Sequence, residues 1–428
     1  MVIDRRKAIL FSSAAALRFI LFFAFPSLPD LLTGRVEIST PVTSFKRLQE
    51  GLFLYTHNVS PYDGGVFHQA SPISRAPLLL PLFALVPPSL FSPLTALLYI
   101  LLDLLCANAL IKITESGESG SSRLFTSPRK DMKWDSIAVA AAYLFNPFTI
   151  ATCIGRPTSV FTNCAILYAI TQAVSGKPIT SMLTLGLASY LSLYPALLLP
   201  PLILLCYDRK ARDIKTPPTV SFSTATYVSV FSASIAWFLY LSKVLTGGSS
   251  EFLASTYGVH LLLPDLTPNV GLWWYFFIEM FDSFREFFLG VFWLHLGGYV
   301  GALCIRLRTQ PLFVITTLLG IFAIFKPYPS ISDTSLYFAM LPLYRHIFPL
   351  MRYTFFALAT ILYATLLGPA FYYLWIYAGS GNANFFYAIT LVWSLGLSEI
   401  VADSLFAVLR DEWEVERPEM KGKDIRQI

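Results

Sequence analysis

The residues best suited to hold a polar ligand lie in the segment AGSGNAN (378–384). The side-chain amides of Asn382 and Asn384 can donate a hydrogen bond to a phosphate oxygen and accept one from a hydroxyl group without carrying charge. Gly379 and Gly381 would let the backbone approach a ligand closely and offer free N–H groups. A helix is expected to begin just after this turn, and its N-terminus would favour an anion. The alternative interpretation is that both asparagines only cap that helix.

A second group of candidates lies in the aromatic segment Trp273–Phe288, which reads WWYFFIEMFDSFREFF. Nine of its sixteen residues are aromatic, yet four charged residues interrupt the rings: Glu279, Asp282, Arg285 and Glu286. In one continuous helix the acids would share a face, with Arg285 beside them. Such a helix suits the membrane–water boundary, where tryptophan and tyrosine concentrate. The segment therefore predicts an interfacial helix that either lines a ligand site or anchors the chain, with its charges paired among themselves.

Three further polar candidates flank this segment. Tyr257 and His260 belong to the polar stretch 251–275 ahead of it, and Lys326 lies in FKPYPS (325–330). Charges at a membrane edge tend to be functional, although a lysine there can also extend harmlessly to the interface. The alternative for His260 is a capping or hydrogen-bonding role, and the whole stretch is equally suited to dock another protein. We treat the three residues as candidate ligand contacts.

The composition indicates a polytopic all-α membrane protein. Of the 428 residues, 55% are hydrophobic and 13% are charged, and the mean hydropathy is +0.61. A soluble protein carries roughly twice that fraction of charge, and many apolar runs here approach the ~20 residues that a membrane-spanning helix needs. The net charge of +5 is spread through the loops, which argues against nucleic-acid binding. The five cysteines lie in or beside apolar runs without metal-ligand spacing, so no metal site is expected.

The charge pattern predicts how the chain crosses the membrane. Arg5, Arg6 and Lys7 precede the first apolar run and place the N-terminus in the cytoplasm. Alternating basic loops then give roughly ten to twelve helical spans, with both ends of the chain cytoplasmic. The predicted regions are one multi-span membrane domain (1–410), a first lumenal loop (26–75), a second lumenal loop that contains an aromatic interfacial helix (246–286) and a cytoplasmic tail (411–428). Arg18 lies inside the first predicted span and should face a neighbouring helix or a cavity.

Five segments together resemble a known family. They are HNVSPYDGGVFH (57–68), YLFNPFTI (143–150), WYFFIEMFDSFREFF (274–288), IFKPYPSISD (324–333) and LWIYAGSGNANFFYAITL (374–391). The resemblance extends from about His57 to Arg410 and is to the PIG-U subunit of glycosylphosphatidylinositol (GPI) transamidase. It implies a noncatalytic, multi-pass subunit in the endoplasmic reticulum membrane. The complex of that family cleaves a C-terminal signal from a protein and joins the new C-terminus to the GPI lipid.

The resemblance also implies what this subunit contacts. In that family the cysteine-protease chemistry belongs to a different, caspase-like subunit, so no catalytic residue is expected here, and no cofactor beyond GPI as a bound substrate. The implied partners are the other transamidase subunits, the GPI lipid, membrane lipids and substrate pro-proteins with C-terminal signals. The rings of the aromatic segment would wall the entry of the lipid tail. Arg285 would then lie near the lipid phosphate, and Glu279 or Asp282 near an ethanolamine amine.

A more distant resemblance points to an enzyme. NPFTI (146–150), GRPTS (155–159) and LYP (193–195) are similar to segments of the lipid-linked sugar mannosyltransferases of the GT-C type, which implies a GT-C-like bundle. Those enzymes place two acids close together in the first lumenal loop as metal ligand or general base. The acids of that loop here are widely spaced: Asp30, Glu37, Glu50 and Asp63. We therefore expect a lipid-binding subunit, with a dolichol-phosphate-mannose-dependent GPI mannosyltransferase and a pure assembly scaffold as the alternatives.

Overall fold

The structure is a computed structural model that describes residues 5–62, 76–213, 219–262 and 266–423. The regular elements of this described part are all helices, and it contains no β-strand beyond one isolated bridge between Ser121 and Thr126. The first half holds α1 (Arg5–Phe23), α2 (Ser27–Thr33), α3 (Phe45–Thr56), α4 (Leu79–Ala84), η1 (Pro88–Leu90), α5 (Phe91–Glu115), α6 (Ser136–Leu144), α7 (Pro147–Gly155), α8 (Ser159–Val174), α9 (Pro178–Leu191), η2 (Tyr194–Leu198) and α10 (Leu199–Asp213). The second half holds α11 (Val220–Leu245), α12 (Glu251–Leu253), η3 (Ala254–Gly258), α13 (Val259–Leu262), α14 (Trp273–Glu279), α15 (Asp282–Arg306), α16 (Pro311–Phe325), α17 (Ile331–Met340), η4 (Leu341–Leu350), α18 (Thr354–Tyr372), η5 (Tyr373–Tyr377), α19 (Ala383–Glu416) and η6 (Pro418–Met420).

Several of these helices are able to cross a membrane. Five are long and apolar enough by themselves: Pro88–Glu115, Val220–Leu245, Asp282–Arg306, Thr354–Tyr377 and Ala383–Glu416. Counting the bent pairs α1–α2 and α6–α7 as one span each gives seven. Three shorter apolar helices, α8, α9 and α16, lie among them. The chain is therefore a multi-pass helical protein, as predicted, while the count of ten to twelve spans and the GT-C-like arrangement stay predictions.

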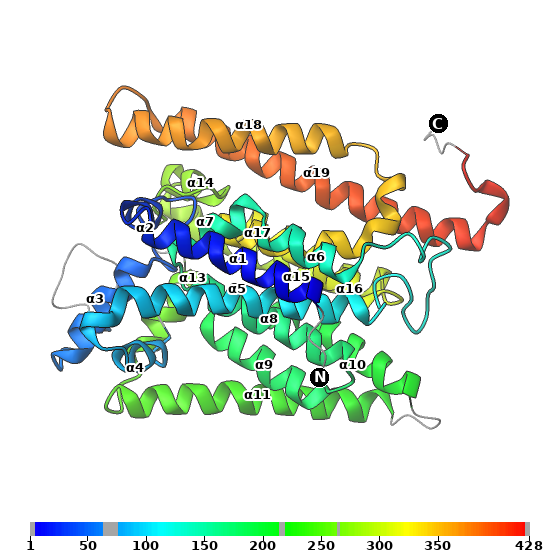
Figure 1. The fold of residues 1–428 in the computed structure, drawn as a ribbon, viewed down its shortest axis with the longest axis horizontal. Coiled ribbons are helices and arrows are strands. Elements are labelled where there is room, and N and C mark those ends of the chain that lie inside the picture. The colour runs from blue at the N-terminus through cyan, green and yellow to red at the C-terminus, as the bar shows by residue number, and fades with distance from the viewer. Residues whose placement is uncertain (1–4, 63–75, 214–218, 263–265, 424–428) are drawn as a thin grey trace.

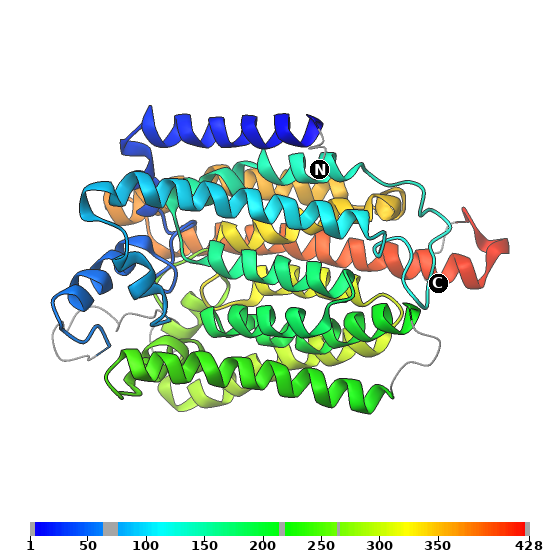
Figure 2. The same ribbon diagram turned by 60° about the horizontal axis from the view of Figure 1, so that its bottom comes forward.

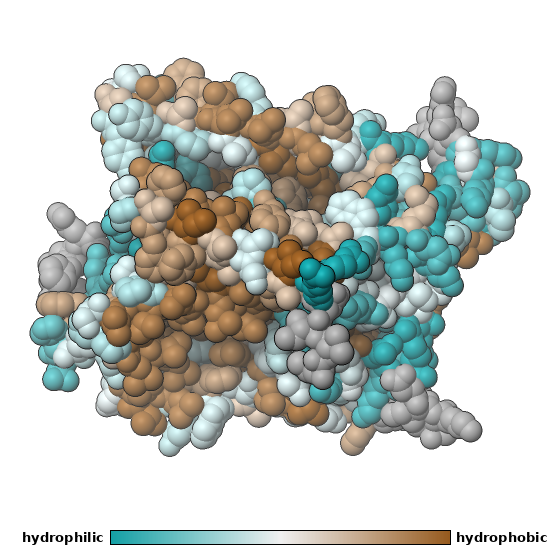
Figure 3. Space-filling model, in the orientation of Figure 1, coloured by the Kyte–Doolittle hydropathy of each residue, from teal (hydrophilic) through white to brown (hydrophobic). Residues whose placement is uncertain are grey.

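The helices run side by side in one bundle (Figures 1 and 2). Helices α8, α16 and α17 are mostly buried and 56% of the apolar stretch that contains α5 is buried, whereas only 17% of the apolar stretches of α11 and α18 is buried. Helix α18 packs on α19, and α11 packs on α9. Helices α2, α3 and α4 and the turn before α19 share one end, which we call the predicted lumenal end (left in Figure 1). On the face shown in Figure 3, hydrophobic residues cover the middle of the bundle. Hydrophilic residues gather at the end opposite the predicted lumenal end.

The motif NPFTI marks a bend inside the bundle. Asn146 caps α7 by accepting a hydrogen bond from the Phe148 N–H at 2.9 Å, and Pro147 takes the first helical position. Helices α6 and α7 consequently meet at 54°. At the other end of α7, Arg156 adopts a left-handed conformation (φ +55°) that stops the helix. The likeness to GT-C segments thus falls on residues that break and bend a span.

The charge of Arg18 is neutralised inside the bundle. Its Nε donates to Asp103 Oδ2 at 2.7 Å, its Nη2 to the Leu144 carbonyl at 2.9 Å, and both charged side chains are almost fully buried. The Tyr143 hydroxyl donates to the other oxygen of Asp103 at 3.3 Å. The prediction that Arg18 faces a neighbouring helix is confirmed, and its partner is Asp103 of α5.

The aromatic segment is not one helix, so the prediction of a continuous interfacial helix is wrong. Helix α14 ends at Glu279, Met280 and Phe281 are extended (ψ 138° and 137°), and α15 begins at Asp282. The break lets α14 pack against α19 while α15 runs along the bundle as a long apolar helix. Asp282 then lies in the first turn of α15, where the helix dipole stabilises a negative charge. Glu279 therefore does not share a helix face with Asp282. Helix α19 also continues to Glu416, so it includes the start of the predicted tail 411–428.

Candidate functional site

The turn before α19 is built as a cap. Asn382 accepts a hydrogen bond from the Phe385 N–H at 3.2 Å and is the N-cap of α19, as the alternative interpretation held for that residue. Gly379 has φ +63°, which favours glycine. The Gly381 N–H donates to the Leu374 carbonyl at 3.0 Å, so the prediction that it is free for a ligand is wrong. A Cβ at Gly381 would come within 3.1 Å of the Trp375 nitrogen, which explains glycine there.

The structure brings this turn and the aromatic segment together. The Tyr275 hydroxyl donates to Asn384 Oδ1, and the ring of Tyr275 stacks on Tyr387 with centroids 4.6 Å apart. Trp274 is fully buried and stacks on Trp375 at 5.9 Å. Helix α14 is thereby fixed to the start of α19. The exposed side chain of Asn384 lies on an aromatic rim made by α14, η5 and α19.

An apolar groove runs along α19 from the level of Phe386. Its volume is about 300 Å³, and its walls are α18, α19, α7 and the segment after α2. The lining residues are Ala364, Thr365, Gly368 and Pro369 of α18; Phe386, Ile389, Thr390 and Trp393 of α19; Pro147, Phe148 and Ala151 of α7; and Leu32, Arg35, Glu37, Ile38, Val270 and Ile331. In Figure 3 the surface is hollowed below the side chains that cover α18. We call this feature the α18–α19 groove.

Two charged residues belong to this groove although the other walls are apolar. Arg35 and Glu37 follow α2, and the Glu37 carbonyl accepts a hydrogen bond from the Ile331 N–H at 2.9 Å. Burial raises the pKa of the Glu37 carboxyl above its ordinary value, partly offset by a hydrogen bond from its backbone and by the charge of Arg35. Glu37 Oε1 has no hydrogen-bond partner among the described residues. Sequence reasoning noted Glu37 only as a lone acid and missed Arg35, because nothing local ties these residues to α18 and α19.

The charges of the aromatic segment lie apart from this groove. Glu279 and Asp282 are exposed, and neither lines the groove. Arg285 is half-buried, with its guanidinium 5.4 Å from the centroid of the Phe277 ring. Their assignment to a lipid phosphate and an ethanolamine amine stays a prediction.

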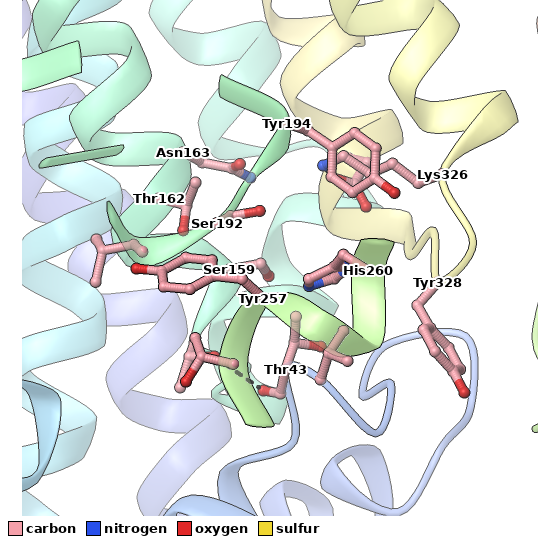
Figure 4. Close-up of a pocket in the computed structure, with 15 residues that line it drawn as sticks. Thr43, Ser159, Thr162, Asn163, Ser192, Tyr194, Tyr257, His260, Lys326 and Tyr328 are labelled. Atoms are coloured by element: carbon pink, nitrogen blue, oxygen red, sulfur yellow. Dashed lines mark hydrogen bonds and ion pairs between the residues drawn. The ribbon is translucent and has the colours of Figure 1, made fainter. Parts of the chain in front are cut away.

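The remaining candidates meet in a second cavity, which we call the polar pocket (Figure 4). Tyr257, His260 and Lys326 line it together with hydroxyl and amide side chains: Thr43, Ser159, Thr162, Asn163, Ser192, Tyr194 and Tyr328. Lys326 forms an ion pair with Asp333 at 2.6 Å, and its ammonium lies 5.4 Å from the centroid of the Tyr194 ring. The Tyr257 hydroxyl donates to the Tyr190 carbonyl at 2.6 Å. Two segments contribute to both the polar pocket and the groove. The segment between α2 and α3 contributes Glu37 to the groove and Thr43 to the pocket, and α17 contributes Ile331 to the groove and Asp333 to the pocket.

His260 makes the stability of this end of the molecule depend on pH. Burial, assisted by the charge of Lys326, lowers the pKa of His260 from 6.5 to about 4. Between those pH values the unfolded chain binds more protons than the folded chain, so stability falls as pH falls through this window. We expect a lower melting temperature at pH 5 than at pH 7, and a smaller difference in His260→Gln. The exposed His57 supplies the control variant His57→Gln. An unchanged pH dependence in His260→Gln would contradict this account.

The described acids of the first predicted loop do not form a pair. Asp30 is exposed and lies 3.6 Å from Arg156, Glu37 lines the groove and Glu50 is exposed, while Asp63 lies outside the described residues. Among the described residues no group of three histidine, cysteine or acidic side chains is placed to hold a metal ion. The geometry instead offers one apolar groove with a polar and aromatic rim, and one polar pocket.

Comparison with known proteins identifies the family. The family model described as "GPI transamidase subunit PIG-U" matches residues 12–393. The chain is 36% identical over 413 residues to the GPI transamidase component GAB1 of Saccharomyces cerevisiae, covering 95% of this chain and 96% of that protein. It is 34% identical over 405 residues to the human GPI-anchor transamidase component PIGU, covering 90% of each, and 32% identical over 415 residues to the GAB1 homologue of Schizosaccharomyces pombe, covering 93% of each. The chain therefore belongs to the PIG-U family of GPI transamidase subunits.

Proposed function

We propose that this chain binds the GPI lipid within the transamidase and presents it for transfer to proteins, with the lipid tail in the α18–α19 groove. The observation that carries the proposal is the groove itself. It is an apolar cavity of about 300 Å³ beside α18, a helix whose other faces are exposed and apolar. Apolar burial of an acyl or alkyl chain is favourable at about 25 cal/mol per Å². A lipid could enter such a groove sideways from the membrane.

The head group of the lipid would then lie at the predicted lumenal end. Arg35 supplies a cation for a phosphate, and Glu37 supplies an acceptor for an amine or a hydroxyl. Asn382 and Asn384 add exposed amides beside the aromatic rim. Arg35 and Glu37 line the groove itself and would add to the predicted contacts of Glu279, Asp282 and Arg285 with the head group. The proposal also includes the C-terminal attachment signal of a substrate protein, which the same rim would contact.

The proposal also covers the membrane location, the topology and the noncatalytic role of the chain. We infer a noncatalytic subunit of the endoplasmic reticulum membrane with both termini cytoplasmic and ten to twelve spans in a GT-C-like bundle. The bond-breaking chemistry would belong to a caspase-like partner subunit. A GPI mannosyltransferase is the alternative. Assaying the purified chain for mannose transfer from dolichol-phosphate-mannose separates the two, and clear turnover would overturn the proposal.

Two substitutions at Asn382 separate lipid binding from helix capping. Asn382→Ala removes the cap and the amide and should destabilise α19 by about 1 kcal/mol, whereas Asn382→Ser keeps a capping oxygen and removes only the amide. If the amide contacts the lipid, both variants should lower retention of GPI by the purified complex several-fold. If the amide only caps, Asn382→Ser should retain GPI like the unsubstituted protein.

Asn384→Asp completes this test. It keeps an acceptor for the Tyr275 hydroxyl and adds a negative charge, which should repel a phosphate. We expect about a tenfold weaker binding of GPI, with normal assembly of the complex measured by co-purification of the other subunits. Normal GPI binding in both Asn382→Ser and Asn384→Asp, with normal assembly, would favour a pure scaffold.

A further inference from the structure

The polar pocket carries an inference that goes beyond the proposed function, because it stands on this pocket's own residues whether or not a tail lies in the groove. We propose that the polar pocket binds one neutral polyhydroxylated ring, a hexose or an inositol. Its walls contain the two kinds of group that such a ring requires: hydroxyl and amide side chains, which are uncharged and both donate and accept, and aromatic rings.

Two polar atoms of this pocket are buried without a hydrogen-bond partner among the described residues. They are the Tyr194 hydroxyl and His260 Nδ1, both shielded from solvent. Tyr194 is only 1% exposed, and its ring lies edge-on to His260 with centroids 5.6 Å apart. Figure 4 shows Tyr194 above His260 at the pocket. Because buried polar groups are nearly always hydrogen-bonded, these two atoms indicate a ligand that supplies hydroxyl groups.

The charges of the pocket favour a neutral ligand over a phosphate. Lys326 is already paired with Asp333 at 2.6 Å, so the pair contributes no net charge. The second oxygen of Asp333 accepts from the Ser330 N–H at 3.0 Å, which fixes the carboxylate. An arriving anion would meet this carboxylate as well as the ammonium. A sugar hydroxyl, in contrast, can donate to the carboxylate and accept from the lysine without disturbing the pair.

The size and walls of the pocket favour the edge of a single ring over a lipid chain. Its volume is about 50 Å³, room for roughly four water molecules, so it can enclose the hydroxyl groups along one edge of a ring but not an acyl chain. Tyr194 stacks against Trp293 at 5.9 Å with an interplanar angle of 13°, so its ring is held rigidly. Asn163 donates to Ser332 Oγ at 2.9 Å and forms part of an ordered polar wall.

The test uses the purified complex and saturation-transfer difference NMR, with methyl α-mannoside and myo-inositol as neutral probes and inorganic phosphate as the anionic probe. We expect a signal from at least one neutral ring. Tyr194→Phe should weaken that binding at least tenfold, because it removes a hydroxyl that is left for the ligand by the part of the chain that the structure describes. The matched control is Tyr227→Phe, which lies outside the pocket and removes another buried hydroxyl without a partner in that part of the chain. This variant should bind like the unsubstituted protein.

Three results would overturn the assignment: no signal from either neutral ring, binding of phosphate in their place, or unchanged binding in Tyr194→Phe. His260→Phe gives a second variant, for which the same loss of binding is expected. Adding a GPI glycolipid then identifies the source of the ring. Competition assigns the pocket to the glycolipid head group, whereas a ring that binds without competition assigns it to a sugar from another source. A tail that fails to occupy the groove leaves these readouts unchanged, so the two proposals can fail separately.

Discussion

Replacing Gly368 by tryptophan is expected to reduce attachment of GPI to proteins at least tenfold, which corresponds to about 1.4 kcal/mol of lost binding free energy. Gly368 lines the α18–α19 groove, and a Cβ there would meet only Ile389 Cγ2 at 4.0 Å. The backbone therefore accepts a side chain at this position, and a tryptophan would project into the space proposed for the lipid tail. The measurement is the yield of a GPI-anchored reporter in microsomes that contain the variant chain.

The control for this variant lies on the same helix. Leu366 is 66% exposed and faces away from the bundle, so Leu366→Trp adds the same group outside the groove. Both variants should assemble with the other subunits, and only Gly368→Trp should lose GPI attachment. Full activity of a well-assembled Gly368→Trp complex would show that the groove does not hold the tail.

Arg18→Leu is expected to prevent accumulation of the folded chain. The substitution leaves the Asp103 carboxylate buried without its charged partner, and breaking a buried pair in this way costs about 3–5 kcal/mol, a large part of the stability of a typical protein. The double variant Arg18→Leu/Asp103→Leu should recover most of the loss, because no buried charge remains. The measurement is the amount of monodisperse protein after detergent extraction, followed by its melting temperature.

A surface pair provides the comparison for this prediction. Arg6 and Asp135 lie 2.8 Å apart, with side chains 71% and 48% exposed, so Arg6→Leu should change stability by less than about 1 kcal/mol. If Arg18→Leu melts like the unsubstituted protein, or if the double variant is as unstable as the single variant, the Arg18–Asp103 pair does not hold α1 to α5.

The parts of the fold that sequence predicted are those set by local chemistry. Long apolar runs predicted a multi-pass helical protein, which the structure confirms. The break at Met280 and Phe281 could not be predicted, because neither residue is a helix breaker. It arises from packing: Trp274 and Tyr275 are held by the start of α19, while α15 follows the bundle.

The candidate site likewise contains residues that residue type singled out and residues that only contacts between distant segments reveal. Residue type singled out the aromatic segment and the 378–384 turn separately, and the Tyr275–Asn384 hydrogen bond brings the two segments together. Arg35 and the role of Glu37 depend on contacts between residues about 330 positions apart along the chain, which no local pattern carries. Asp103 was missed as the partner of Arg18 for the same reason.

The most direct test of the central claim is photo-crosslinking of a GPI lipid that carries a photoreactive group in its acyl chain, added to the assembled transamidase and followed by peptide mass spectrometry. If the tail lies in the α18–α19 groove, label should appear on peptides that contain Ala364, Thr365, Ile389 or Thr390, and Gly368→Trp should abolish it. Label confined to the other subunits, with these four residues unmodified in the active complex, would contradict the account.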